Sequence, residues 1–166
     1  MTTSRRRRRS QVALILVGLV AAHFYLRPRL WEGRAAPDFL LLALLLLAIR
    51  SRPGAAAAAG FLVGLVTDIL TPARFGAGAL AHTIVGYLAA WGRAVFFPDN
   101  LLVNAGLFAA GTWVRTLLVL VASGSGGAEL AATLGVWAPI QAVLTALVGV
   151  IVVLLFRNWL AIRLDE

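Results

Sequence analysis

Six apolar segments, separated by short polar breaks, make up most of this 166-residue chain. About 20 consecutive apolar residues are enough for a helix to cross the hydrocarbon core of a bilayer. Because 61% of the residues are hydrophobic and 13% are charged, a soluble domain of this size would be unable to bury its apolar surface. The sequence therefore predicts an all-α integral membrane protein, a bundle of six transmembrane helices. The segments run over residues 11–26, 35–49, 54–71, 76–97, 100–122 and 130–156.

The second and third segments are shorter than an ordinary span. One alternative is a re-entrant hairpin with RSRPG, residues 50–54, at its tip. That hairpin would place Arg50 and Arg52 near the middle of the membrane, where each arginine costs about 2.5–3.5 kcal/mol. Two short or tilted spans, accommodated by local thinning of the bilayer or by snorkelling side chains, are the favoured interpretation.

The distribution of arginine predicts the orientation, because all fifteen basic residues are arginines. With six spans and a cytoplasmic N-terminus, ten arginines lie on the cytoplasmic side and four lie outside, while Arg115 falls within a span. Since cytoplasmic loops carry the excess of basic residues, both termini are predicted to be cytoplasmic. The chain then divides into a basic tail at residues 1–10, a six-helix membrane domain at 11–157 and a short tail at 158–166.

The run Arg5–Arg9 directly precedes the first apolar segment. A basic cluster beside a span usually fixes orientation and contacts anionic lipid, and this interpretation is favoured over binding of nucleic acid. The same pattern also fits a cleaved signal peptide. However, no small-x-small cleavage site is followed by a polar start, so a retained first helix is favoured.

The stretch GFLVGLVTD, residues 60–68, places two glycines and a carboxylate on one stripe of a helix. Gly60 and Gly64 allow the backbone of a second helix to approach closely, and Gly78 and Gly86 repeat this small-residue pattern in the fourth segment. We expect these four glycines to mediate helix packing inside the bundle.

Asp68 is a carboxylate inside a predicted span, and such a group normally faces protein or water and has a partner. Counted at 1.5 Å per residue from the outer ends of their helices, His82 and Arg115 fall in the same band of the membrane. We therefore expect the three residues to form an intramembrane polar cluster in which Arg115 or His82 holds the carboxylate. Two interpretations stay open, a structural ion pair and a site for a ligand or partner.

No catalytic residue, metal ligand or cofactor site is predicted. The chain has no cysteine, its two histidines lie far apart, and no serine nucleophile motif is present. The stretch GAGALA, residues 76–81, fits the pattern G-x-G-x-x-A of dinucleotide-binding proteins, but no βαβ unit surrounds it.

Residues 36–92 resemble the family of the rod shape-determining protein MreD. The family pattern begins with a proline and a polar residue that open the second helix, followed by a glycine-rich third helix that ends in G-x-x-x-D-[IL]-[IL]. A short outer turn follows, then F/L-G and a helix that ends in G/A-Y-L. The last two helices match the family in hydropathy alone. The matching positions in this chain are Pro37, Asp38, Gly60, Phe61, Gly64, Asp68, Ile69, Leu70, Gly76 and Tyr87.

The resemblance implies a non-enzymatic inner-membrane subunit of the bacterial cell-elongation machinery. Its expected partner is MreC, a bitopic protein with a periplasmic domain. Together they would link cytoplasmic MreB filaments to the glycosyltransferase RodA and its transpeptidase.

The family is also similar in fold to the substrate-binding subunits of energy-coupling-factor transporters. This similarity implies an alternative function, the binding of a small molecule or lipid in an outward-facing pocket. The outer connections of this chain are short or glycine-rich and offer no long lid, which favours the scaffold.

Overall fold

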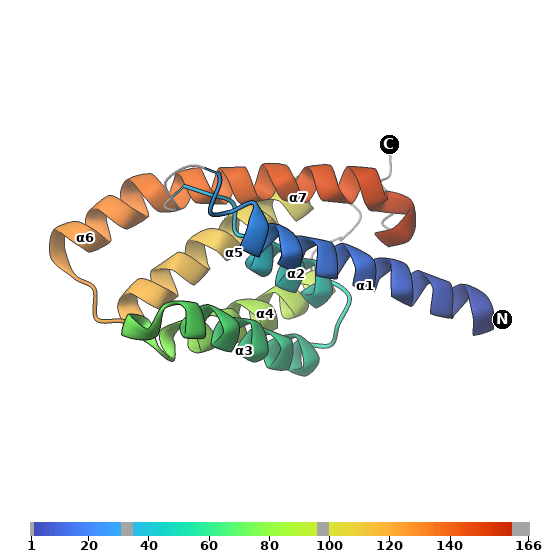
Figure 1. Ribbon diagram of the computed structural model, residues 1–166, viewed down its shortest axis with the longest axis horizontal. Coiled ribbons are helices and arrows are strands. Elements are labelled where there is room, and N and C mark those ends of the chain that lie inside the picture. Colours follow the sequence, from blue (N-terminus) through green and yellow to red (C-terminus); the bar gives the residue numbers. More distant parts are fainter. Residues whose placement is uncertain (1, 31–34, 96–99, 161–166) are drawn as a thin grey trace.

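The computed structural model describes residues 2–30, 35–95 and 100–160, and these residues form helices and no strand. Figure 1 shows the long helices running in alternating directions, with the start of α1 and the end of α7 at one end of the bundle and α6 at the other. The elements are α1 (Thr2–Tyr25), α2 (Phe39–Ala48), α3 (Pro53–Leu70), the 3₁₀ helix η1 (Pro72–Arg74), α4 (Ala77–Val95), α5 (Leu101–Ala122), α6 (Gly127–Ala132), the π-helical turn η2 (Thr133–Trp137) and α7 (Ala138–Leu160).

The all-helical prediction is confirmed for the described residues, and the helices match the six apolar segments in order. Three stretches are long and apolar enough to cross a membrane, Pro53–Leu70, Leu101–Ala122 and Gly127–Phe156. The last of these joins α6, η2 and α7 into one helical rod. Large apolar side chains are exposed along the helices, including Leu102 and Leu155. Such a surface is favourable in contact with lipid and unfavourable in contact with water.

The helices extend into both predicted tails, whose position relative to the membrane stays a prediction. The helix α1 begins at Thr2, so the arginine run belongs to the same helix as the first apolar segment. At the other end, α7 continues to Leu160, and residues 161–166 lie outside the described part of the chain.

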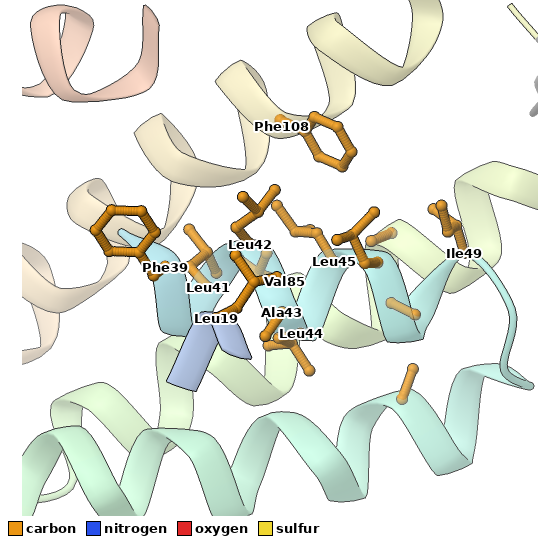
Figure 2. Close-up of a cluster of buried hydrophobic side chains, with 14 of the residues drawn as sticks. Leu19, Phe39, Leu41, Leu42, Ala43, Leu44, Leu45, Ile49, Val85 and Phe108 are labelled. Atoms are coloured by element: carbon orange, nitrogen blue, oxygen red, sulfur yellow. The ribbon is translucent and has the colours of Figure 1, made fainter. Parts of the chain in front are cut away.

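The helix α2 differs most from its prediction as a span over residues 35–49. Its 10 residues give a length of about 15 Å, half the thickness of the hydrocarbon core. All of its side chains except that of Leu47 are buried, so the helix is enclosed by protein instead of facing lipid. Figure 2 shows Leu42 and Leu45 on the side of Phe108 of α5, and Ala43 and Leu44 on the opposite side. The run of leucines serves as the core around which the other helices pack.

The helices α3 and α4 cross with their backbones in direct contact. Gly60 lies against the backbone carbonyl of His82, and Gly64 lies against the backbone of Gly78 and Ala79. A side chain at either α3 glycine would overlap these backbone atoms. In lipid, where burial of apolar surface gives little drive for association, such close packing holds helices together.

The same interface uses glycines from α4. Gly86 lies against the backbone carbonyl of Ala56 on α3, and Gly78 lies against the side chains of Thr67 and Asp68. The four glycines singled out in the sequence therefore all lie where α3 meets α4.

A bulky residue at Gly64 should separate these two helices. Overpacking a protein core typically lowers the free energy of unfolding by about 1–3 kcal/mol. Gly64→Leu is expected to lower it by more than this, because backbone atoms of α4 must move. Gly106→Leu on the exposed face of α5 is the matched control, since a Cβ there meets no atom within 4 Å. Thermal unfolding of both variants in detergent checks this, and equal midpoints for the two would contradict the crossing.

Candidate functional site

A network of buried polar side chains surrounds the start of α2. Asp38 is fully buried and caps this helix, because its Oδ1 accepts a hydrogen bond from the backbone N–H of Leu41 at 3.1 Å. Its Oδ2 lies 3.4 Å from Nη2 of Arg115 on α5, and its Oδ1 lies 3.7 Å from Nδ1 of His23 on α1. A carboxylate is favourable at the N-terminus of a helix, where the backbone N–H groups have no partner within the helix. Asp38 thus joins α1, α2 and α5 at one point.

Two polar side chains of α7 hold the non-helical residues before α2. The hydroxyl of Thr145 accepts a hydrogen bond from the backbone N–H of Asp38 at 3.1 Å. The amide of Gln141 donates to the carbonyl of Ala36 at 3.1 Å. Irregular backbone is tolerated inside a membrane protein only where protein groups satisfy it, and these two side chains do so here.

Asp68 lies near the end of α3 and caps the start of α4. Its Oδ1 accepts from the N–H of Gly78 at 2.8 Å, and its Oδ2 accepts from Ala79 at 2.9 Å and from Gly76 at 3.0 Å. The carboxylate is thereby satisfied by backbone N–H groups at the positive end of a helix. Gly76 has φ +92°, a left-handed conformation that glycine adopts without strain, and it turns the chain into α4.

The predicted partner of Asp68 was therefore wrong. Arg115 makes its ion pair with Asp38, and Asp68 makes none with any residue in the described ranges. His82 is fully buried, with Nδ1 2.8 Å from the carbonyl oxygen of Gly78 one turn earlier on α4. Counting residues from a helix end locates a side chain along its helix but does not give the direction in which it points.

The sequence-based cluster also missed Asp38 and His23. Asp38 was identified only as a motif residue, although a polar residue directly before a leucine run is a recognisable N-cap. Nothing in the sequence indicated that His23, at the end of α1, would contact it. Of the other motif residues, Pro37 directly precedes the N-cap, while Tyr87 is 47% exposed on α4.

Two hollows open beside this network, towards the end of the molecule at which α6 lies. One has a volume of about 410 Å³ and lies among the end of α1, the end of α3, the start of α4 and α5. The other has a volume of about 310 Å³ and lies among α5, α6 and α7. Three residues line both hollows, and we call them the arginine cluster: Arg27, Arg74 and Arg115.

The charged groups of the hollows are paired unequally. Nη2 of Arg74 donates to Oε1 of Glu129 at 2.8 Å, and both side chains are exposed. Arg27, in the turn after α1, has Nη1 3.5 Å from Nε2 of His23 and forms no ion pair with a described residue. Residues 2–30, 35–95 and 100–160 contain no group of three or more His, Cys, Asp or Glu side chains arranged to hold a metal ion.

Comparison with known families identifies one match. The family model described as rod shape-determining protein MreD matches residues 7–163, which includes the last two helices as well as the motif. No curated protein and no solved structure matches the chain.

The pairing of Asp38 with Arg115 predicts a thermodynamic coupling. Arg115→Gln should be strongly destabilising, by about 3–5 kcal/mol for a buried pair that loses one partner, because the carboxylate of Asp38 is left without its cation. Adding Asp38→Asn should recover part of that loss, since no buried charge then remains. Thermal unfolding of the two single variants and the double variant in detergent measures the coupling.

Asp68 should behave independently of Arg115. Asp68→Ala removes the acceptor of three N–H groups, and each buried donor left unpaired costs about 1–3 kcal/mol. Combining it with Arg115→Gln should add the two losses. Rescue of Asp68→Ala by Arg115→Gln would show instead that these two side chains form the pair.

Proposed function

The chain belongs to the family of the rod shape-determining protein MreD, and on this premise we propose that it is a non-enzymatic scaffold subunit of the bacterial cell-elongation machinery. In this role it binds MreC and helps to regulate cell shape and peptidoglycan synthesis. MreB, RodA and its transpeptidase are then direct or indirect partners. The observation that carries the proposal is the family match over residues 7–163.

The surface of the bundle supports a role in binding membrane partners. Large apolar side chains are exposed on α1, α5 and α7, among them Leu14, Val17, Leu102 and Leu155. A face of this kind packs equally well against lipid and against the transmembrane helix of another protein. The protein therefore offers a partner such as MreC several apolar faces within the membrane.

We propose that the chain crosses the inner membrane six times, with both termini in the cytoplasm. The second crossing then consists of the short helix α2 together with the non-helical residues before it, enclosed by the other helices. The alternating directions of the helices in Figure 1 and the excess of arginine near the start of α1 support this orientation. The arginine run at the start of α1 would then contact anionic lipid of the cytoplasmic leaflet. The end that carries α6 and the two hollows would face outside.

A second candidate is the binding of a small molecule or lipid in an outward-facing pocket. It is favoured by the two hollows, whose volumes of about 410 and 310 Å³ fall within the range of roughly 300–1,000 Å³ seen for small-molecule sites. The two functions are compatible, because the pocket and the apolar faces use different surfaces. The likeness to energy-coupling-factor transporter subunits stays a prediction.

The orientation is tested with single cysteines, because the natural chain contains none. Ser51 follows α2 and Ser125 precedes α6, and Figure 1 shows these two connections at opposite ends of the bundle. A thiol reagent that does not cross membranes is added to cells whose outer membrane has been permeabilised and whose inner membrane is intact. It should label the cysteine at 125 and not that at 51. Labelling of both positions from one side would refute the six-span arrangement.

The scaffold function is tested by co-purification of MreC after mild detergent extraction. Wild-type protein should retain MreC, and so should a variant in which Arg5–Arg9 are all replaced by glutamine, because binding is expected to occur through the apolar faces of the bundle. An unrelated polytopic membrane protein with the same arginine run attached is the control. Capture that follows the arginine run instead of the bundle would show that the association is only electrostatic.

A further inference from the structure

The arginine cluster gathers three guanidinium groups from separate parts of the chain. Arg27 lies in the turn after α1, Arg74 ends η1, and Arg115 belongs to α5. All three line both hollows at the same end of the bundle. The sequence places few arginines in the segments predicted to lie outside, as the positive-inside rule leads one to expect. Three arginines nevertheless line the two hollows. We propose, resting on the second function given above, that the cluster binds an oxyanion, the phosphate group of a ligand.

The hydrogen-bonding capacity of the cluster is not exhausted by the protein. Nε of Arg27 and Nε of Arg115 are buried and have no hydrogen-bond partner among the described residues. The 3.4 Å contact between Arg115 and Asp38 is longer than a typical charge-assisted hydrogen bond, which is about 2.7–2.9 Å. A buried donor without an acceptor is costly, and an oxygen-rich anion is the kind of ligand that removes this cost.

The carboxylates nearby are already engaged. Both oxygens of Asp68 accept backbone N–H groups, and Glu129 is held by Arg74. Arg27 is the member of the cluster that forms no ion pair with a described carboxylate. Because a guanidinium binds phosphate and carboxylate through two parallel hydrogen bonds, Arg27 is the residue that best anchors the ligand.

The walls of the hollows also accommodate an apolar part of the ligand. The hollow beside α3 is lined partly by Leu70 and Val119, and the one beside α7 by Leu120 and Trp137. A charged group held by arginine next to apolar side chains suits the headgroup of an anionic lipid at the edge of the membrane. A free phosphate would use the same arginine contacts without the apolar ones. The two sources share one chemistry and are separated by experiment.

Arg27→Gln is the test variant, and Arg29→Gln is its matched control. Arg29 lies two residues further along the same turn, lines neither hollow, and donates to the carbonyl of Tyr25 at 3.0 Å on the exposed surface. Both variants keep the arginine run of α1, so lipid bound there is the same in each. Helix content by circular dichroism and the unfolding midpoint without ligand establish that both variants are folded.

Two probes distinguish the sources. Native mass spectrometry with added phosphatidylglycerol or phosphatidylcholine measures lipid binding, and the unfolding midpoint with added inorganic phosphate measures binding of the free anion. For a lipid, Arg27→Gln should bind phosphatidylglycerol about tenfold more weakly than Arg29→Gln, with no difference for phosphatidylcholine. For a free anion, phosphate should raise the midpoint of the wild type and of Arg29→Gln but not that of Arg27→Gln. If neither probe separates Arg27→Gln from Arg29→Gln, the proposal is overturned.

Discussion

The carboxylate of Asp68 satisfies the start of α4, and the packing of α3 on α4 depends on this contact. The first N–H groups of a helix have no partner within the helix, and in a membrane there is no water to supply one. Asp68 accepts three such hydrogen bonds, which requires the start of α4 to lie directly against the end of α3. Gly78 leaves room for the carboxylate, and Gly60 and Gly64 let the two backbones meet further along. The stripe of small residues and the carboxylate on it therefore act together to hold α4 against α3.

Asp38 solves the same problem at the start of α2. This helix is too short to reach across the membrane, so its N-terminus lies inside the protein and needs buried partners. The carboxylate caps the helix, and its charge is offset by Arg115. Nδ1 of His23 accepts a hydrogen bond from the backbone N–H of Leu40 in α2, while Thr145 and Gln141 of α7 satisfy the backbone beside it. Four helices are thus fixed relative to one another by groups that have no alternative partner in lipid. We expect such a network to rigidify the bundle.

The polar interior is concentrated towards one end of the bundle, where the hollows and the arginine cluster lie. The exposed apolar faces lie along the sides of the helices. This separation lets a partner helix bind within the membrane while an anionic group occupies the hollows. A ligand in the hollows would contact the ends of α1 and α5. Because the sides of these two helices are among the exposed apolar faces, binding of the ligand and binding of a partner helix would involve the same helices.

The sequence by itself determined the solvent, the helical class and the order of the helices, because hydropathy and helix period are properties of each segment alone. It also identified the glycines and the carboxylate on one stripe of α3, since spacing of four residues fixes a face. Only the tertiary structure decided that backbone N–H groups hold Asp68, that Arg115 pairs with Asp38, and that α2 is a short buried core. Depth along a helix can be counted from the sequence, but the rotation of each helix and the identity of its neighbours depend on packing among all of them. The leucine run of α2 is apolar on every side, so its sequence does not distinguish a side that faces protein from a side that faces lipid. Only the positions of the surrounding helices show that it is covered by protein.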